Sequence, residues 1–104
     1  MSLPLIILDE AEDELKAAAD YYEEQSAGLG AELRAEIARA LEQVCSFPRS
    51  GKPVSGRAPV VELRQVFVRR FPFSVVYLLE PTSIWIVAFA HHRRRPGYWK
   101  RRVP

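Results

Sequence analysis

Apolar residues recur every three or four positions through the first half of the chain, which is the spacing of an amphipathic helix. The first such stripe is formed by Ala11, Leu15, Ala18, Ala19 and Tyr22, and the second by Leu29, Leu33, Ile37, Leu41 and Val44. The pattern predicts one helix that ends at about Glu24 and a second that runs to Val44. The sequence QSAGLG at 25–30 interrupts the period, so the two helices should form an αα-hairpin.

The helix ends carry their own signals. Asp9, followed three residues later by Glu12, is predicted to cap the first helix with its side chain. Pro48 lies just past the second stripe, where a proline can no longer continue a helix.

Short apolar runs replace the helical period in the second half and predict β-strands. The runs are Val61–Phe71, Phe73–Leu79 and Ile84–Ala90, with Pro72 ending the first of them. A four-residue turn at 80–83 should join the last two strands as an antiparallel hairpin. Leu5–Leu8 is compatible with one more strand, and residues 47–59 are predicted as a loop. The order β-α-α-β-β-β predicts an α+β domain, in which the helical hairpin packs on one face of an antiparallel sheet.

Alternation along these strands assigns side chains to faces. Arg64 would share a largely apolar face with Val66 and Val68, where a long cation either reaches solvent or meets an anion. In the last strand, one row would hold Trp85, Val87, Phe89 and His91. His91 and His92 should then point to opposite faces.

The composition describes a single domain, residues 1–104. A chain of 104 residues that is 48% hydrophobic can bury one core but not two. Its one cysteine, Cys45, allows no internal disulfide, which suits a reducing compartment, and no signal peptide or membrane span is evident. We therefore expect a cytoplasmic protein without a membrane segment.

The net charge of +2 conceals a strong asymmetry along the chain. Residues 1–48 carry eleven acids and three bases, and residues 49–104 carry twelve bases and two acids, so the two parts have net charges of −8 and +10. An anionic partner for the second part, either nucleic acid or an acidic protein segment, is one explanation. The other is that the helix and strand surfaces simply differ in charge.

No cofactor or metal site is expected. Cys45, His91 and His92 do not have the spacing of zinc ligands, and no phosphate-binding glycine loop or Ser-His-Asp signature is present. Metal-independent RNA cleavage would need a base, an acid and cations around the phosphate. His91, Tyr98, Arg64, Arg93 and Arg94 are of the right types, but many basic, histidine-containing sheets offer the same set.

Four segments together resemble the RelE/ParE superfamily of bacterial toxins from type II toxin–antitoxin systems. They are AEDELKAAADYYEEQ, CSFPRSGKPVSGR, ELRQVFVRRFPFSVVYLL and IVAFAHHRRRPGYWKRR. The first contains the acidic helix with its tyrosine pair. The positions that match the family patterns in the other three are Pro48, Gly51, Arg64, Val66, Val68, Phe71, Pro72, Phe73, Val75, Tyr77, His91, Arg93, Arg94, Pro96 and Trp99.

Within the superfamily, the ending H-x-R-R-x-P-x-x-W and the F-P-F junction resemble the ParE, or plasmid-stabilisation, branch. That branch implies inhibition of DNA gyrase without a nuclease site. The RelE branch implies a ribosome-dependent mRNA endonuclease, whose site here would be Arg64, His91, Arg94 and Tyr98. The strand FSVVYLL contains no lysine or arginine, and the second half of the chain has only Lys52 and Lys100 as lysines, which favours ParE. An inactive relative that serves as an interaction domain is the third alternative.

The resemblance also implies partners. They are a ParD-like antitoxin, with which the toxin would form a hetero-oligomer, and gyrase as target, or the ribosome and mRNA in the RelE alternative. The candidate residues for target or antitoxin binding are Arg64, Arg93, Arg94, Tyr98 and Trp99. Tyr98 and Trp99 are typical interface anchors, although Trp99 could instead pack back onto the sheet.

Overall fold

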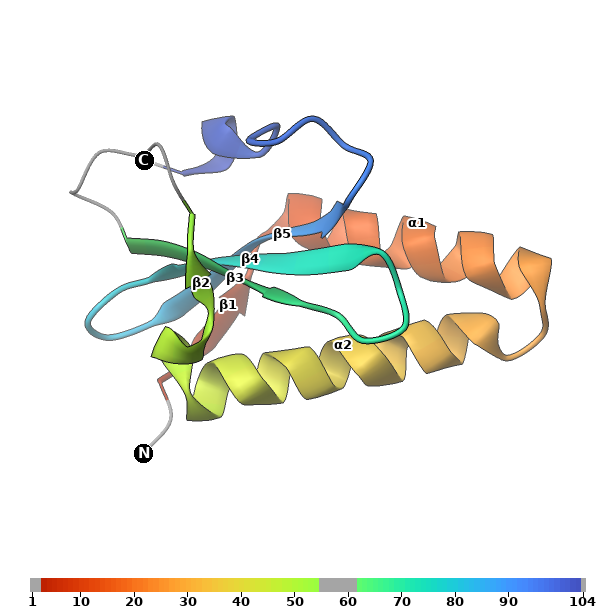
Figure 1. Cartoon of the computed structure of the whole chain (residues 1–104), viewed down its shortest axis with the longest axis horizontal. Coiled ribbons are helices and arrows are strands. Elements are labelled where there is room, and N and C mark those ends of the chain that lie inside the picture. The colour runs from red at the N-terminus through yellow and green to blue at the C-terminus, as the bar shows by residue number, and fades with distance from the viewer. Residues whose placement is uncertain (1–2, 55–61, 104) are drawn as a thin grey trace.

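The computed structural model describes residues 3–54 and 62–103 (Figure 1). Its helices are α1 (Asp9–Gln25) and α2 (Leu29–Ser46), with short 3-10 turns η1 (Pro48–Ser50) and η2 (Lys100–Arg102). Its strands are β1 (Leu5–Ile7), β2 (Lys52–Pro53), β3 (Glu62–Phe67), β4 (Phe73–Leu79) and β5 (Ile84–His91). The predicted α+β class, the helical hairpin and the β4–β5 hairpin are confirmed. Val61 and residues 55–59 of the predicted loop lie outside the described residues.

The five strands form one mixed sheet in the order β1-β5-β4-β3-β2. The pairs from β2 to β5 are antiparallel, as predicted, but β1 lies parallel to β5, with Leu5 opposite Ile84 and Ile7 opposite Ile86. The chain enters at one edge of the sheet, passes through both helices and returns at the other edge. Part of the predicted loop, Lys52–Pro53, supplies that second edge.

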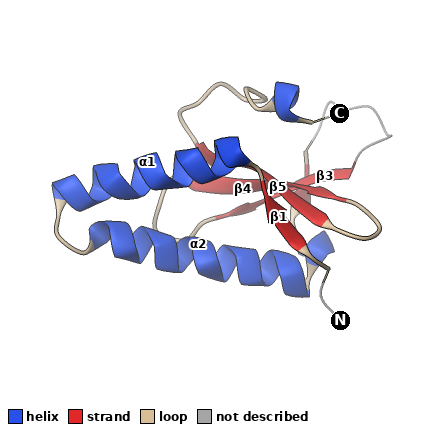
Figure 2. Cartoon of the chain, turned by 180° about the vertical axis from the view of Figure 1, so that it is seen from behind, coloured by secondary structure: helices blue, strands red, loops and turns tan. Residues whose placement is uncertain are grey.

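Both faces of the sheet are covered. The helices pack on one face over a helix-side core, whose largest fully buried residues include Leu33, Ile37, Tyr77 and Phe89. On the other face the segment after β5, which we call the tail (Arg93–Val103), runs back across the strands (Figure 2). This tail-side core contains Leu63, Val76, Leu78, Val87, Ala88 and Trp99. The tail therefore belongs to the fold.

A β-bulge in β5 explains why one predicted row of side chains is wrong. Val76 pairs with Ala88 and Tyr77 pairs with Ile86, which leaves Val87 as an extra residue. Because an extra residue reverses the alternation, Trp85 and Val87 contact the tail-side core while Phe89 belongs to the helix-side core. His91 stacks edge to face on Phe73, also a helix-side residue, at 5.0 Å between ring centroids.

Two predicted boundaries are also corrected. Asp9 is the first residue of α1, the cap position is Leu8, and no side chain bonds the cap. Asp9 still lies in a first turn with Glu10 and Glu12, where negative charge favours the helix dipole.

The strand predicted to reach Phe71 ends at Phe67. The chain turns at Arg69 and Arg70, and Arg70 adopts a left-handed φ of 70°. Arg70 forms an exposed ion pair of 2.6 Å with Glu32, which connects this turn to α2. Proline at 72 thus follows the turn rather than causing it.

Candidate functional site

The tail is fixed to the sheet by Trp99. Its side chain is 5% exposed and packs with Leu63, Val76 and Leu78 of the tail-side core. Burial of a large aromatic residue at this position contributes a substantial part of the stability of that core. Of the two sequence interpretations for Trp99, the structure thus places it as a packing residue.

Glu14 of α1 ties the tail to the helices. The Tyr98 hydroxyl donates to Glu14 Oε2, and Arg102 donates to both carboxylate oxygens at 3.0 and 3.1 Å. Glu14 Oε1 also accepts the backbone N–H of Phe89 at 3.1 Å, while Arg102 donates to the carbonyl of Val87 at 3.0 Å. The cluster thus satisfies two backbone groups of β5 that lie beyond Ile86, where the pairing with β1 ends.

Burial and charge in this cluster affect the protonation of its members. Burial, followed by the hydrogen bond to Glu14, raises the pKa of Tyr98, so the hydroxyl stays protonated. The bond to Glu14 also raises the pKa of Arg102. The side chains of Glu14 and Arg102 are each 16% exposed, so solvent screens their ion pair little.

Glu14 and Arg102, which join the tail to α1 and β5, were not among the residues that the sequence singled out. A signal for Glu14 existed, since it lies three residues after Ala11 and four before Ala18, within the apolar stripe of the first helix. An acid at such a position must find a partner when the stripe is buried. No comparable signal marks Arg102 among its basic neighbours.

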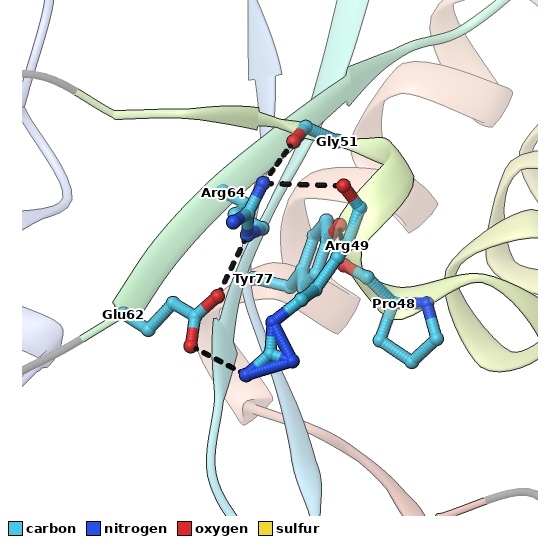
Figure 3. Close-up of polar contacts among 6 residues, drawn as sticks. All are labelled: Pro48, Arg49, Gly51, Glu62, Arg64 and Tyr77. Carbon is cyan, nitrogen blue, oxygen red and sulfur yellow. Dashed lines mark hydrogen bonds and ion pairs between the residues drawn. The ribbon is translucent and has the colours of Figure 1, made fainter.

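Arg64 lies in a separate cluster at the end of α2 (Figure 3). Its Nη1 donates to the carbonyl oxygens of Gly51 at 2.7 Å and Arg49 at 3.2 Å, and its Nε donates to Glu62 Oε2 at 2.8 Å. The opposite residue on β4, Tyr77, donates its hydroxyl to the carbonyl of Pro48. Arg64 therefore does meet an anion, and its guanidinium holds the loop that follows α2.

The two histidines point to opposite faces, as predicted. His91 lies against Phe73 on the helix side. His92 Nε2 is 3.0 Å from the Ser74 hydroxyl, and its ring makes a T-shaped contact with Phe67 on the tail side. Partial burial, then the charges of Arg93 and His92, lower the pKa of His91. This favours the neutral imidazole at physiological pH.

The tail presents the basic residues that the sequence emphasised. Arg93, Arg94, Arg95, Lys100 and Arg101 are all exposed. Among the described residues, none of the five makes an ion pair with a carboxylate. The Arg94 guanidinium lies 3.9 Å from the centroid of the Tyr98 ring, a cation–π contact that orients it.

The four candidate nuclease residues are not brought to one place. His91, Arg94 and Tyr98 line one groove between the tail and the sheet. Arg64 is absent from that lining, and its partner across the strands, Tyr77, belongs to the helix-side core. Among the described residues, no three His, Cys, Asp or Glu side chains gather as a metal site.

Comparison with known proteins now identifies the fold. A family model described as the ParE toxin of the type II toxin–antitoxin system parDE matches residues 5–96. The chain belongs to the ParE toxin family. That match contains both helices and all five strands and ends at Pro96, before Tyr98 and Trp99.

A solved structure agrees with the ParE assignment. The chromosomal ParDE TA system from P. aeruginosa contains a chain that aligns with a TM-score of 0.65 and 22% sequence identity, over 86% of this chain and 96% of that one. At this identity the similarity establishes the shared ParE fold alone. A comparison with curated protein sequences finds no match. In the part of the chain that the structure describes, neither ParE helix is long and apolar enough to cross a membrane.

Proposed function

We propose that this chain inhibits DNA gyrase in the cytoplasm as the toxin of a type II module and that a cognate ParD-like antitoxin neutralises it. The observation that carries the proposal is the ParE family match over residues 5–96, which includes every helix and strand before the tail. Gyrase as target follows from the resemblance to ParE.

The positions of the candidate nuclease residues support a toxin that binds its target without cleaving RNA. General acid catalysis needs a group that gives up its proton near neutral pH. The Tyr98 hydroxyl is bonded to Glu14, and burial raises its pKa. The Arg64 guanidinium is occupied by two backbone carbonyls and by Glu62.

The exposed cations of the tail are the proposed contact with the target. Arg93 and Arg94 offer planar guanidinium groups, which form paired hydrogen bonds with carboxylates or phosphates. Because Trp99 is buried and Arg102 is bonded to Glu14, the tail holds these groups on a rigid base. A rigid base lowers the entropy cost of association.

A groove beside α1 suits the antitoxin. It is lined by Ala18, Tyr21 and Tyr22 of α1 and by Phe73 and His91 of the sheet. Small and aromatic side chains in such a groove accommodate the apolar face of a helix. The net charge of +10 in the second part of the chain would favour an acidic segment in the same partner.

The first experiment is a gyrase supercoiling and DNA-cleavage assay with purified, antitoxin-free protein. We expect inhibition, or trapped double-strand breaks, at near-stoichiometric toxin. The double variant Arg93→Gln/Arg94→Gln should lose inhibition, whereas Lys16→Gln/Arg34→Gln, which removes the same charge from the exposed surfaces of α1 and α2, should retain it.

The proposed target would be wrong if protein that is folded, and toxic in cells, had no effect on gyrase. Codon-phased cuts in ribosome-bound mRNA would then assign the chain to the RelE-like alternative. Absence of growth arrest on expression without a partner would instead indicate an inactive interaction domain.

A further inference from the structure

A groove between the tail and the sheet has a basic and aromatic lining, of which the proposed gyrase inhibition uses only Arg94. We call it the tail groove and define it by six of its lining residues: Phe67, His92, Arg94, Arg95, Tyr98 and Lys100. Its cavity volume is about 430 Å³, within the range of binding sites for small molecules or single nucleotides. Two of these residues, Tyr98 and Lys100, lie beyond the segment that the ParE family model matches.

The charge of the tail groove is entirely positive or neutral. No aspartate or glutamate is among the residues that line it. Arg94, Arg95 and Lys100 line it without a carboxylate partner among the described residues. These three cations repel one another when no counter-ion is bound. An anion in the groove relieves that repulsion and is therefore attracted strongly.

An exposed aromatic ring lies in the same groove. Phe67 is 57% exposed, an unusual position for a phenylalanine next to two well-packed cores. Lys52 Nζ lies 5.6 Å from the centroid of its ring, and His92 meets the ring edge to face at 5.6 Å. Despite these contacts most of the side chain is open to solvent, and an exposed aromatic ring is the kind of surface on which unpaired bases stack.

We propose that the tail groove binds a single strand of nucleic acid, with one base stacked on Phe67 and the adjacent phosphates held by Arg94, Arg95 and Lys100. Both kinds of contact have a physical basis. Aromatic rings stack on any base, and cations bind the backbone of any sequence. The proposal does not depend on gyrase being the target.

The proposed contacts are with the base and the phosphates, which DNA and RNA strands share. They do not involve the 2′-hydroxyl, although Gln65, His91 and His92 in the lining could hydrogen-bond one. We therefore expect deoxyribose and ribose strands to bind with similar affinity.

The test is fluorescence anisotropy of the full chain with labelled oligothymidylate and oligouridylate across a range of salt concentrations. Both strands should bind saturably with similar affinity, and each should bind more tightly than a duplex of the same length. Phe67→Leu should weaken binding by about fivefold or more, the effect of losing one stacked base. Tyr21→Leu, which alters an aromatic residue that is 58% exposed outside the groove, should have no effect.

The cations are tested by the salt dependence. Arg95→Gln/Lys100→Gln should reduce the slope of log affinity against log salt by about 1.4, because each phosphate contact in a single strand contributes roughly 0.7. The charge-matched control Lys16→Gln/Arg34→Gln should leave the slope unchanged. Circular dichroism melting of each variant would show that the fold is retained.

Three results would overturn the proposal. One is an affinity of Phe67→Leu equal to that of the unmodified chain. Another is a preference of tenfold or more for ribose over deoxyribose. The third is displacement of the oligonucleotide by polyglutamate of equal charge, which would assign the groove to an acidic peptide. A negative gyrase assay alone would leave the proposal standing, since oligonucleotide binding is measured without gyrase.

Discussion

The Tyr98 hydroxyl donates a hydrogen bond to the Glu14 carboxylate across 84 positions of sequence. The same carboxylate receives Arg102 and the backbone N–H of Phe89, so one side chain joins α1, β5 and the tail.

Replacement of Glu14 by alanine should destabilise the protein by about 3 kcal/mol, because it leaves the largely buried Arg102 without its anion and the Phe89 N–H without an acceptor. Urea denaturation followed by circular dichroism measures this change. Glu12→Ala, on the exposed side of the same helix, should change stability by no more than about 0.5 kcal/mol. Similar values for the two variants would show that the Glu14 cluster contributes nothing to folding.

Alkaline pH should weaken the fold through Tyr98. Its folded-state pKa is raised, so the unfolded chain loses this proton first, and stability falls as pH rises above the ordinary tyrosine pKa of about 10. Below that pH the contribution is fully present. Urea midpoints at a series of alkaline pH values should decline more steeply for the unmodified chain than for Tyr98→Phe. Parallel curves for the two proteins would contradict the assigned role.

Arg64→Lys should cost about 1–3 kcal/mol, because a single ammonium group cannot reproduce the forked contacts to Gly51, Arg49 and Glu62. Thermal unfolding measures the loss, with Arg69→Lys in the exposed β3–β4 turn as the control. Gyrase inhibition per folded molecule should be unchanged. A variant that melts normally but no longer inhibits gyrase would instead make Arg64 a target contact.

Gly51→Ala should destabilise the loop after α2 by about 1–3 kcal/mol, the usual cost of overpacking. A Cβ atom at Gly51 would lie 2.9 Å from the Gln65 carbonyl oxygen and would clash with the Tyr77 hydroxyl. In the Tyr77→Phe background the hydroxyl is gone, so the same substitution should cost less. A double-mutant cycle from urea denaturation gives the coupling, and strict additivity of the two changes would refute the contact.

The helices and the β4–β5 hairpin could be predicted because their signals are local. Leu33, Ile37 and Val44 repeat at the helical period, and the Glu80 N–H is bonded to the Ser83 carbonyl within the predicted turn. The contacts between distant parts of the chain give weaker signals in the sequence. Nothing in Leu5–Leu8 indicates that this strand pairs in parallel with β5, since the pairing partner is nearly 80 residues away.

The candidate site was predicted by residue type more than by geometry. Simple alternation placed Val87 and Phe89 on one face, but the bulge separated them. Arg64 and Trp99 were predicted as binding residues from their residue types, and that role stays a prediction. In the structure, Arg64 donates to backbone carbonyls that need a donor, and Trp99 covers apolar side chains on the sheet. Both residues thus have a structural role, which their residue types alone do not distinguish from a role in binding.

The burial of Trp99 has a consequence for how loss of toxicity arises by mutation. A premature stop codon anywhere between Arg93 and Trp99 would remove Trp99 together with the basic residues after the stop, and would uncover Leu63, Val76 and Leu78. The shortened product would aggregate or be degraded instead of persisting as a folded, harmless protein. A truncation series would consequently assign to target recognition a loss of toxicity that results from misfolding. Only substitutions at exposed tail positions can separate loss of recognition from loss of the fold.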